Sequence, residues 1–129
     1  LGAGTGTKVE DLGVGFYTKY GDGGVDISPI ADLLKSEVFK IAYHLGIVSS
    51  IQKAQPTDGL WDDDRSDVDQ LGATYDELEW AMNYLEDNSQ GDLSEREKKV
   101  LEIYSLHHQT NLHKMNPIPV CKIPKSLIF

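Results

Sequence analysis

The 129-residue sequence has a single cysteine, Cys121, and no long apolar run. One cysteine excludes an internal disulfide framework and any zinc site built on several cysteines. No stretch approaches the roughly 20 apolar residues of a membrane-spanning helix. We therefore expect a soluble protein with no membrane partner and, because a free thiol suits a reducing compartment, a cytoplasmic one.

Basic residues are also scarce, since 12 lysines and arginines stand against 21 aspartates and glutamates, for a formal net charge of −9. Such a chain lacks the broad basic surface that nucleic-acid-binding proteins use, and we predict no nucleic-acid partner. Anionic ligands can still bind where single lysines or backbone N–H groups gather. With 40% hydrophobic residues, the chain has the length and composition of one domain, or part of one, with a buried core.

The first 15 residues are rich in glycine but match no standard nucleotide motif. Leu1 followed by Gly-Ala-Gly-Thr-Gly looks like the end of a strand entering a loop, so we expect the chain to begin inside a domain. The G-x-G-x-x-G spacing fails, and Lys8 does not follow a glycine as in Walker A. Glycines still admit phosphate to backbone N–H groups, Thr5 adds a hydroxyl, and Glu10 can bind a divalent cation. Phosphate binding and a purely structural turn both stay open.

The segment TKYGDGGVDISP, residues 18–29, combines turn chemistry with two charged residues that a turn does not require. Its glycines permit tight turns, and Ser-Pro commonly opens a helix. Lys19 and Asp26 flank the turn; a lysine suits a carboxylate or phosphate, and an aspartate suits a ribose hydroxyl or an amine. Lys35, near a helix start, opposes the helix dipole and favours a nearby anion. Ligand-binding and structural interpretations both stay open here.

Apolar spacing and capping residues predict a mostly helical chain. An amphipathic helix is expected over 34–45, ended by Gly46, with a short helical piece at 50–54. Three further helix starts are predicted: Ser66 with Asp69 opens a short turn ended by Gly72, and Thr74 with Glu77 and Ser94 with Glu97 are capping boxes. The second of these helices should point Leu78, Met82 and Leu85 inward. The third should run through about Met115, because a proline at 117 stops it and leaves an extended tail.

The acidic run of residues 62–69 and the histidines carry no recognisable catalytic pattern. The run lacks the glycine and glutamate of an EF-hand, and we expect a solvated loop. His107 is predicted to face the core and His108 to be exposed. No Ser–His–Asp or Cys–His arrangement presents itself, so no catalytic side chain is assigned.

Five stretches together resemble the NAD synthetases, more closely the bacterial ammonia-dependent type: GTGTKVED, GFYTKYGDGGVDISPIADLLKSEVFKIAYHLGI, QPTDGLWDD, DVDQLGATYDELE and HKMNPIPV. The resemblance implies an α/β fold of the adenine-nucleotide α-hydrolase-like type, a parallel sheet flanked by helices, in a homodimeric full-length protein. It implies that the nicotinate carboxylate of deamido-NAD is adenylated with Mg²⁺ and ATP, releasing pyrophosphate. Ammonia then displaces AMP and gives NAD.

The resemblance also implies roles for individual residues. ATP would be bound by Thr5, Lys35 and Thr57, and Mg²⁺ by Glu10. The remaining matches would bind deamido-NAD: Lys19, Asp26, His113 and Lys114.

The chain departs from the family pattern in one major respect, because the Ser-Gly-Gly-x-Asp-Ser pyrophosphate loop is nowhere in it. We therefore expect residues 1–129 to be the C-terminal part of a single synthetase domain, lacking the N-terminal half and inactive alone. Thr7 also stands where the family commonly has asparagine.

Three alternatives remain. The chain can be the synthetase half of a glutamine-dependent enzyme, with an amidase domain upstream. It can be a non-catalytic helical interaction module, which would require Thr5, Glu10 and Lys35 to lie far apart. A Rossmann dehydrogenase half is disfavoured by the failed glycine spacing.

Overall fold

The computed structural model describes residues 1–54, 57 and 66–127. Within these residues the chain is mostly helical, as predicted, and contains no strand. One isolated parallel bridge joins Ala3 to Ile27, and Gly4 N–H donates to the carbonyl of Ile27 at 2.8 Å. The expected strand end near Leu1 therefore appears only as this single bridge, which pairs the glycine-rich loop with the end of the 18–29 segment.

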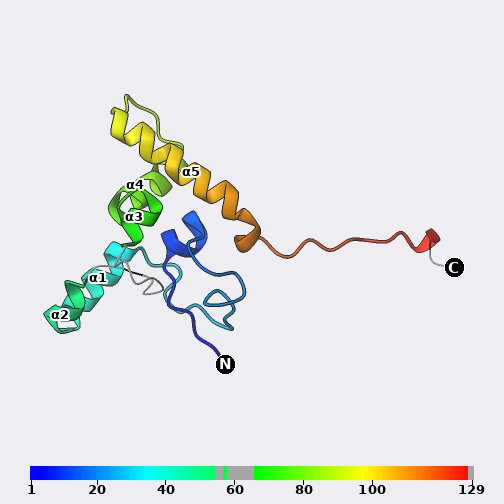
Figure 1. Cartoon of the computed structure of the whole chain (residues 1–129), viewed down its shortest axis with the longest axis horizontal. Coiled ribbons are helices and arrows are strands. Elements are labelled where there is room, and N and C mark those ends of the chain that lie inside the picture. The colour runs from blue at the N-terminus through cyan, green and yellow to red at the C-terminus, as the bar shows by residue number, and fades with distance from the viewer. Residues whose placement is uncertain (55–56, 58–65, 128–129) are drawn as a thin grey trace.

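The helices are a six-residue π-helix η1 (Val9–Val14), α1 (Lys35–His44), α2 (Ser49–Gln52), α3 (Asp67–Leu71), α4 (Tyr75–Glu86), α5 (Glu95–Met115) and a 3-10 turn η2 (Lys125–Leu127). In Figure 1, α1 and α2 extend to one side of the molecule, and the chain after α5 runs away from the helices on the other. Within the described ranges, no helix is both long and apolar enough to cross a membrane.

The three predicted helix starts are confirmed at α3, α4 and α5; the two predicted capping boxes are present at α4 and α5, and α3 has one as well. The side chains of Ser66, Thr74 and Ser94 each accept a hydrogen bond from the backbone N–H three residues later. The acid at that third position accepts the cap's own N–H in return. Each cap stabilises its helix by about 1 kcal/mol. Helix α5 ends at Met115, before Asn116 and Pro117, as predicted.

The core lies where η1 packs against α4 and α5. Its buried side chains come from these three helices, from the last residue of α3 and from the α3–α4 turn: Val9, Val14, Leu71, Ala73, Tyr75, Leu78, Ala81, Met82, Val100 and Tyr104. Leu78 and Met82 point inward as predicted, but the prediction for Leu85 is wrong, since it is 44% exposed. The buried stripe of α4 stops one turn before the helix ends, beside the ion pair of Lys8 and Glu86.

Helix α1 has the predicted bounds but not the expected burial. None of its residues is buried, and the apolar Ile41 and Leu45 are 43% and 71% exposed. Its first turn is anchored to α4, because Ser36 donates its N–H and its hydroxyl to Glu79 at 2.9 and 2.6 Å. Gly46 ends the helix with φ of 67°, as its position predicted.

Candidate functional site

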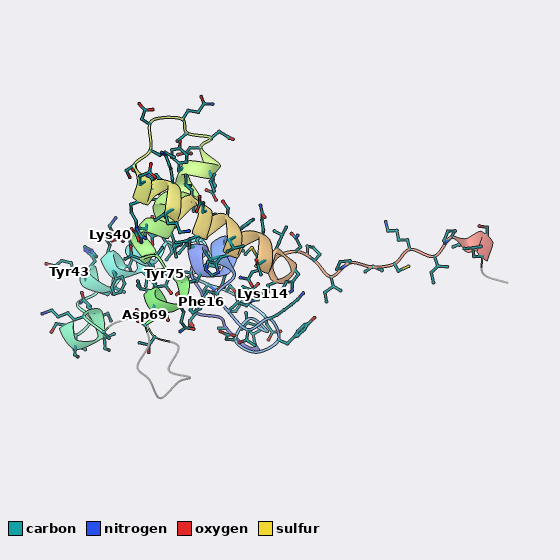
Figure 2. All side chains as sticks on the ribbon, turned by 45° about the horizontal axis from the view of Figure 1, so that its top comes forward. Phe16, Lys40, Tyr43, Asp69, Tyr75 and Lys114 are labelled. Atoms are coloured by element: carbon teal, nitrogen blue, oxygen red, sulfur yellow. The ribbon has the colours of Figure 1, made fainter. Side chains whose placement is uncertain are left out.

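A cavity of about 540 Å³ opens between the glycine-rich loop, η1, the 18–29 segment and the ends of α1, α3 and α5. Figure 2 labels two of its lining residues, Phe16, which follows η1, and Lys114, in the last turn of α5. Five of the eight site residues expected from the resemblance line this cavity: Thr5, Glu10, Lys35, Thr57 and Lys114. These residues come from four separate parts of the sequence, and folding brings them to one place.

Glu10 is the most heavily hydrogen-bonded side chain in the cavity wall. Its Oε1 accepts from Lys35 Nζ and from the Tyr75 hydroxyl, both at 2.7 Å. Its Oε2 accepts the Thr7 hydroxyl at 2.6 Å and the Thr7 N–H at 3.1 Å. Lys35 Nζ also lies 4.8 Å from the centre of the Tyr75 ring. Both charges of the Lys35–Glu10 pair are therefore held in fixed directions at the cavity wall.

These contacts determine the charge of Glu10. Burial on its own would raise the pKa of this carboxyl, but the hydrogen bonds from Lys35, Thr7 and Tyr75 outweigh it, and the pKa lies below its ordinary value. Glu10 is therefore an anion at neutral pH, although it is only 13% exposed. Burial raises the pKa of Tyr75, and the two neighbouring carboxylates raise it further, so this hydroxyl keeps its proton.

Tyr75 also connects the site to Asp67, which the sequence had assigned to a solvated acidic loop. That assignment is wrong for Asp67, because it begins α3, is 5% exposed and lines the cavity. Its Oδ2 lies 2.7 Å from the Tyr75 hydroxyl, while its buried Oδ1 has no partner among the described groups. Residues 62–65 of the acidic run lie outside the described residues.

The last turns of α5 hold the other side of the cavity through backbone carbonyls. His108 Nδ1 lies 2.7 Å from the Gly13 carbonyl, and Asn111 donates to that of Val14 at 2.9 Å. Lys114 Nζ donates to the carbonyls of Gly15 and Tyr17 at 2.8 and 2.7 Å. Its pKa is lowered, chiefly by burial.

Neither histidine assignment holds fully. His108 is half-buried by its contact with Gly13, not exposed as expected. His107 is also half-buried; its Nε2 lies 3.2 Å from the carbonyl of the core residue Leu71, so it is on the core side as expected but is not fully buried.

Three expected deamido-NAD residues do not line the cavity. Lys19 Nζ donates to the backbone carbonyl of His113, which ties the 18–29 segment to the end of α5. Asp26 accepts the Gly2 N–H at 2.7 Å and supports the glycine-rich loop instead. Lys19 and His113 therefore lie together, next to Lys114 in sequence, whereas Asp26 contacts the start of the chain. Their contacts are structural in the described chain.

The charges around the cavity are predominantly negative. Four carboxylates face two lysines: Glu10, Asp11, Asp22 and Asp67 against Lys35 and Lys114. Burial raises the pKa of Asp11, and the charges of Glu10 and Asp22 add to this. In residues 1–54, 57 and 66–127, no three His, Cys, Asp or Glu side chains are grouped so as to hold a metal ion by themselves.

Sequence reasoning missed two residues of this site. Both lie in the stretch DVDQLGATYDELE that resembles the family, but Tyr75 was otherwise noted only beside a helix cap and Asp67 only in an acidic run, and neither was given a role in a site. The available signal was Asp67 at the first position of a capped helix, close in sequence to an aromatic residue that can donate a hydrogen bond. That pattern is common in helices, and it does not indicate a cavity.

Comparison with known proteins gives a consistent result. A family model described as NAD synthase matches residues 1–117. An NH₃-dependent NAD⁺ synthetase of Archaeoglobus fulgidus is 38% identical over 123 residues, covering 95% of this chain and 47% of the relative. That of Picrophilus torridus is 38% identical over 128 residues, covering 99% of this chain and 47% of the relative.

A solved structure is similar as well. The NMN synthetase from Francisella tularensis matches with a TM-score of 0.75 and 30% identity, covering 94% of this chain and 46% of that one. The chain thus spans about half the length of the curated relatives it matches. Since the family model matches most of its length, the chain belongs to the NAD synthase family.

Proposed function

We propose that residues 1–129 form the C-terminal part of a single NAD synthetase domain. The whole protein would be an ATP-dependent carbon–nitrogen ligase that amidates deamido-NAD with ammonia. The nicotinate carboxylate would first be adenylated with release of pyrophosphate, and ammonia would then displace AMP to give NAD. The names of the relatives support this assignment. For the whole protein we further propose the adenine-nucleotide α-hydrolase-like fold, a homodimer and a cytoplasmic location.

The observation that carries the proposal is the convergence of Thr5, Glu10, Lys35 and Lys114 on one cavity. A non-catalytic module would have no reason to gather these residues, and their convergence argues against that alternative. In the adenylation step a carboxylate attacks a phosphate, so two anions approach each other. Cations held in fixed positions lower the energy of such a transition state most effectively.

Each lining residue then has a role in the proposed reaction. Lys35 would offset charge on the ATP phosphates, since its Nζ lies at the cavity wall and is only partly exposed. Thr5 and the neighbouring glycines would offer hydroxyl and backbone donors to the nucleotide. Lys114 would help bind deamido-NAD from the end of α5, with Lys19 and His113 beside it. Asp26 would contribute to deamido-NAD binding from its position beside the glycine-rich loop, which it supports through Gly2.

Glu10 fits the role of magnesium ligand. Mg²⁺ usually binds through one or two carboxylates together with substrate phosphates and waters. A single carboxylate from this chain can therefore serve as its protein ligand here. Glu10 is anionic and lines the cavity, and the lysine on its Oε1 is the same one proposed for the phosphates. When bound, the ion would neutralise phosphate charge.

The test uses the full-length protein supplied with ATP, Mg²⁺, ammonium and deamido-NAD. We expect equimolar NAD, AMP and pyrophosphate, measured by chromatography. Glu10→Gln and Lys35→Ala should lower kcat/KM by about 100-fold or more, because each removes a charge at the reacting phosphates. Lys40→Ala is the matched control, an exposed lysine on the same helix. Equal activity of all three variants would refute the roles proposed here.

The isolated 129-residue chain should form no NAD under the same conditions. NAD formation by it would contradict the proposed division of the domain. Supplying glutamine in place of ammonium separates the ammonia-dependent enzyme from the glutamine-dependent alternative.

A second substrate is worth testing because the matched Francisella structure is an NMN synthetase. The acid corresponding to NMN is nicotinate mononucleotide, which has the same reacting carboxylate and lacks the adenylate half. We expect a higher kcat/KM for the dinucleotide. A higher value for the mononucleotide would reassign the substrate without changing the reaction class.

A further inference from the structure

Helix α1 has an unusual attachment to the rest of the molecule. It begins with Lys35, yet none of its own residues is buried, so apolar packing does not fix its direction. Its first turn is instead held by Glu79 of α4. Glu79 is 6% exposed, and its carboxylate accepts both the N–H and the hydroxyl of Ser36, the residue after Lys35.

Helix α4 supports both members of the Lys35–Glu10 pair from one face. Tyr75 and Glu79 are four residues apart and so lie one above the other on α4. Tyr75 donates to Glu10 and stacks against Lys35, whereas Glu79 fixes the turn from which Lys35 projects. The core residues Leu78 and Met82 lie three residues after Tyr75 and Glu79 on the adjoining part of the same face, and their packing holds α4 in place.

Glu79 also offsets an unfavourable charge arrangement. A lysine in the first turn of a helix lies at the positive end of the helix dipole, which disfavours it. The carboxylates of Glu10 at the Lys35 ammonium and of Glu79 at the next amide supply negative charge at that end. A buried carboxylate satisfied by two donors is rigid, so it transmits the position of α4 to the start of α1.

We propose that Glu79 is a positioning residue that acts through Ser36 to direct Lys35 at the nucleotide phosphates. This inference rests on the proposed synthetase function. The expected effect of losing Glu79 is limited to ATP, because its described hydrogen bonds reach neither the 18–29 segment nor the end of α5. Loss of Glu79 should therefore weaken ATP use and leave the binding of deamido-NAD unchanged.

The experiment measures the KM for ATP and for deamido-NAD in the full-length protein and its variants. Glu79→Ala should raise the KM for ATP by about tenfold, as expected for the loss of a charged hydrogen-bond acceptor, with the KM for deamido-NAD within about twofold of wild type. Glu79→Gln keeps an acceptor for the Ser36 N–H and should recover part of the loss. Ser36→Ala, which removes the hydroxyl donor, should shift the same constant in the same direction.

Glu86→Ala is the matched control, because it removes an exposed glutamate from the same helix, where it pairs with Lys8 at 3.3 Å. It should leave both constants unchanged. An unchanged KM for ATP in Glu79→Ala would overturn the inference while the synthetase assignment stands. An equal rise in both constants would also overturn it, since that indicates general loosening of the fold.

Two further outcomes are decisive. If Glu79→Ala does not fold, Glu79→Gln and Ser36→Ala decide the matter by the same comparison of constants. If the wild-type protein makes no NAD, the proposed function fails and the positioning role fails with it.

Discussion

Gly15 and Gly46 allow the energy of one close contact to be separated from the energy of backbone conformation. Both have left-handed φ values, 63° and 67°. A Cβ added at Gly46 meets nothing within 4 Å, whereas one added at Gly15 would lie 2.5 Å from Asn111 Cβ and 3.0 Å from Met115 Cε. An alanine at either position therefore has the same conformational cost, but only Gly15→Ala has a clash.

The magnitudes follow from these contacts. Holding alanine at a left-handed φ costs about 1 kcal/mol, which is the whole expected effect of Gly46→Ala. At Gly15 the clash is with a Cβ fixed on a helix, so the backbone must shift, and overpacking of this kind adds about 1–3 kcal/mol. The shift would also strain the bond from Asn111 to the Val14 carbonyl. We expect Gly15→Ala to lower the free energy of unfolding by about 2–4 kcal/mol.

The assay is chemical denaturation of the wild-type protein and both variants, followed by circular dichroism. The difference between the two variants isolates the contact of the 13–17 segment with α5. Equal destabilisation by the two alanines would refute the reasoning, since it would mean that α5 does not constrain this segment in solution. In a double-mutant cycle, Gly15→Ala should cost less in an Asn111→Gly background than in the wild-type protein, because the clashing Cβ is then absent.

Two more predictions concern charged groups. Hydrogen bonds from Arg96 lower the pKa of Glu77 to about 2, against an ordinary value of 4.5. The stability that ionised Glu77 contributes is therefore complete above pH 4.5 and is lost as the pH falls towards 2. Glu77→Gln should make the free energy of unfolding depend less on pH in this range. An unchanged slope would contradict the prediction. At Tyr75, one hydroxyl proton lies between the oxygens of Glu10 and Asp67, each at 2.7 Å. Asp67→Asn can donate to the tyrosine oxygen and should keep or raise the melting temperature, whereas Tyr75→Phe leaves two carboxylates without this partner and should lower stability by about 1–3 kcal/mol. A lower melting temperature for Asp67→Asn than for Tyr75→Phe would show that sharing one proton between the two carboxylates does not destabilise the protein.

The sequence was informative wherever the determining interaction is local. Ser66, Thr74 and Ser94 identify helix starts because each caps a backbone group three residues away. Leu85 and His108 were misassigned because their exposure depends on which distant segment covers them. Apolar periodicity indicates which face of a helix is packed, but it does not show how far along the helix the covering segment extends.

The candidate site shows the same limit. Glu10 and Tyr75 are 65 residues apart, and Lys114 meets the Tyr17 carbonyl across 97 residues. No spacing rule connects such positions. The family resemblance predicted that Glu10 and Lys114 serve one site, but it gave no role to Tyr75. Asp67 was missed because burial of an acidic residue depends on a hydroxyl donor in another helix.

The three side chains that α5 extends to the 13–17 segment, His108, Asn111 and Lys114, impose a constraint on length. Each successive residue of an α-helix turns by about 100°, so inserting one residue after His108 would rotate the two later donors away from their carbonyls together. The helix would remain regular, and its composition would be almost unchanged. The cavity wall would nevertheless lose its support. In this part of the protein, insertions and deletions in α5 should therefore be tolerated less well than most single substitutions.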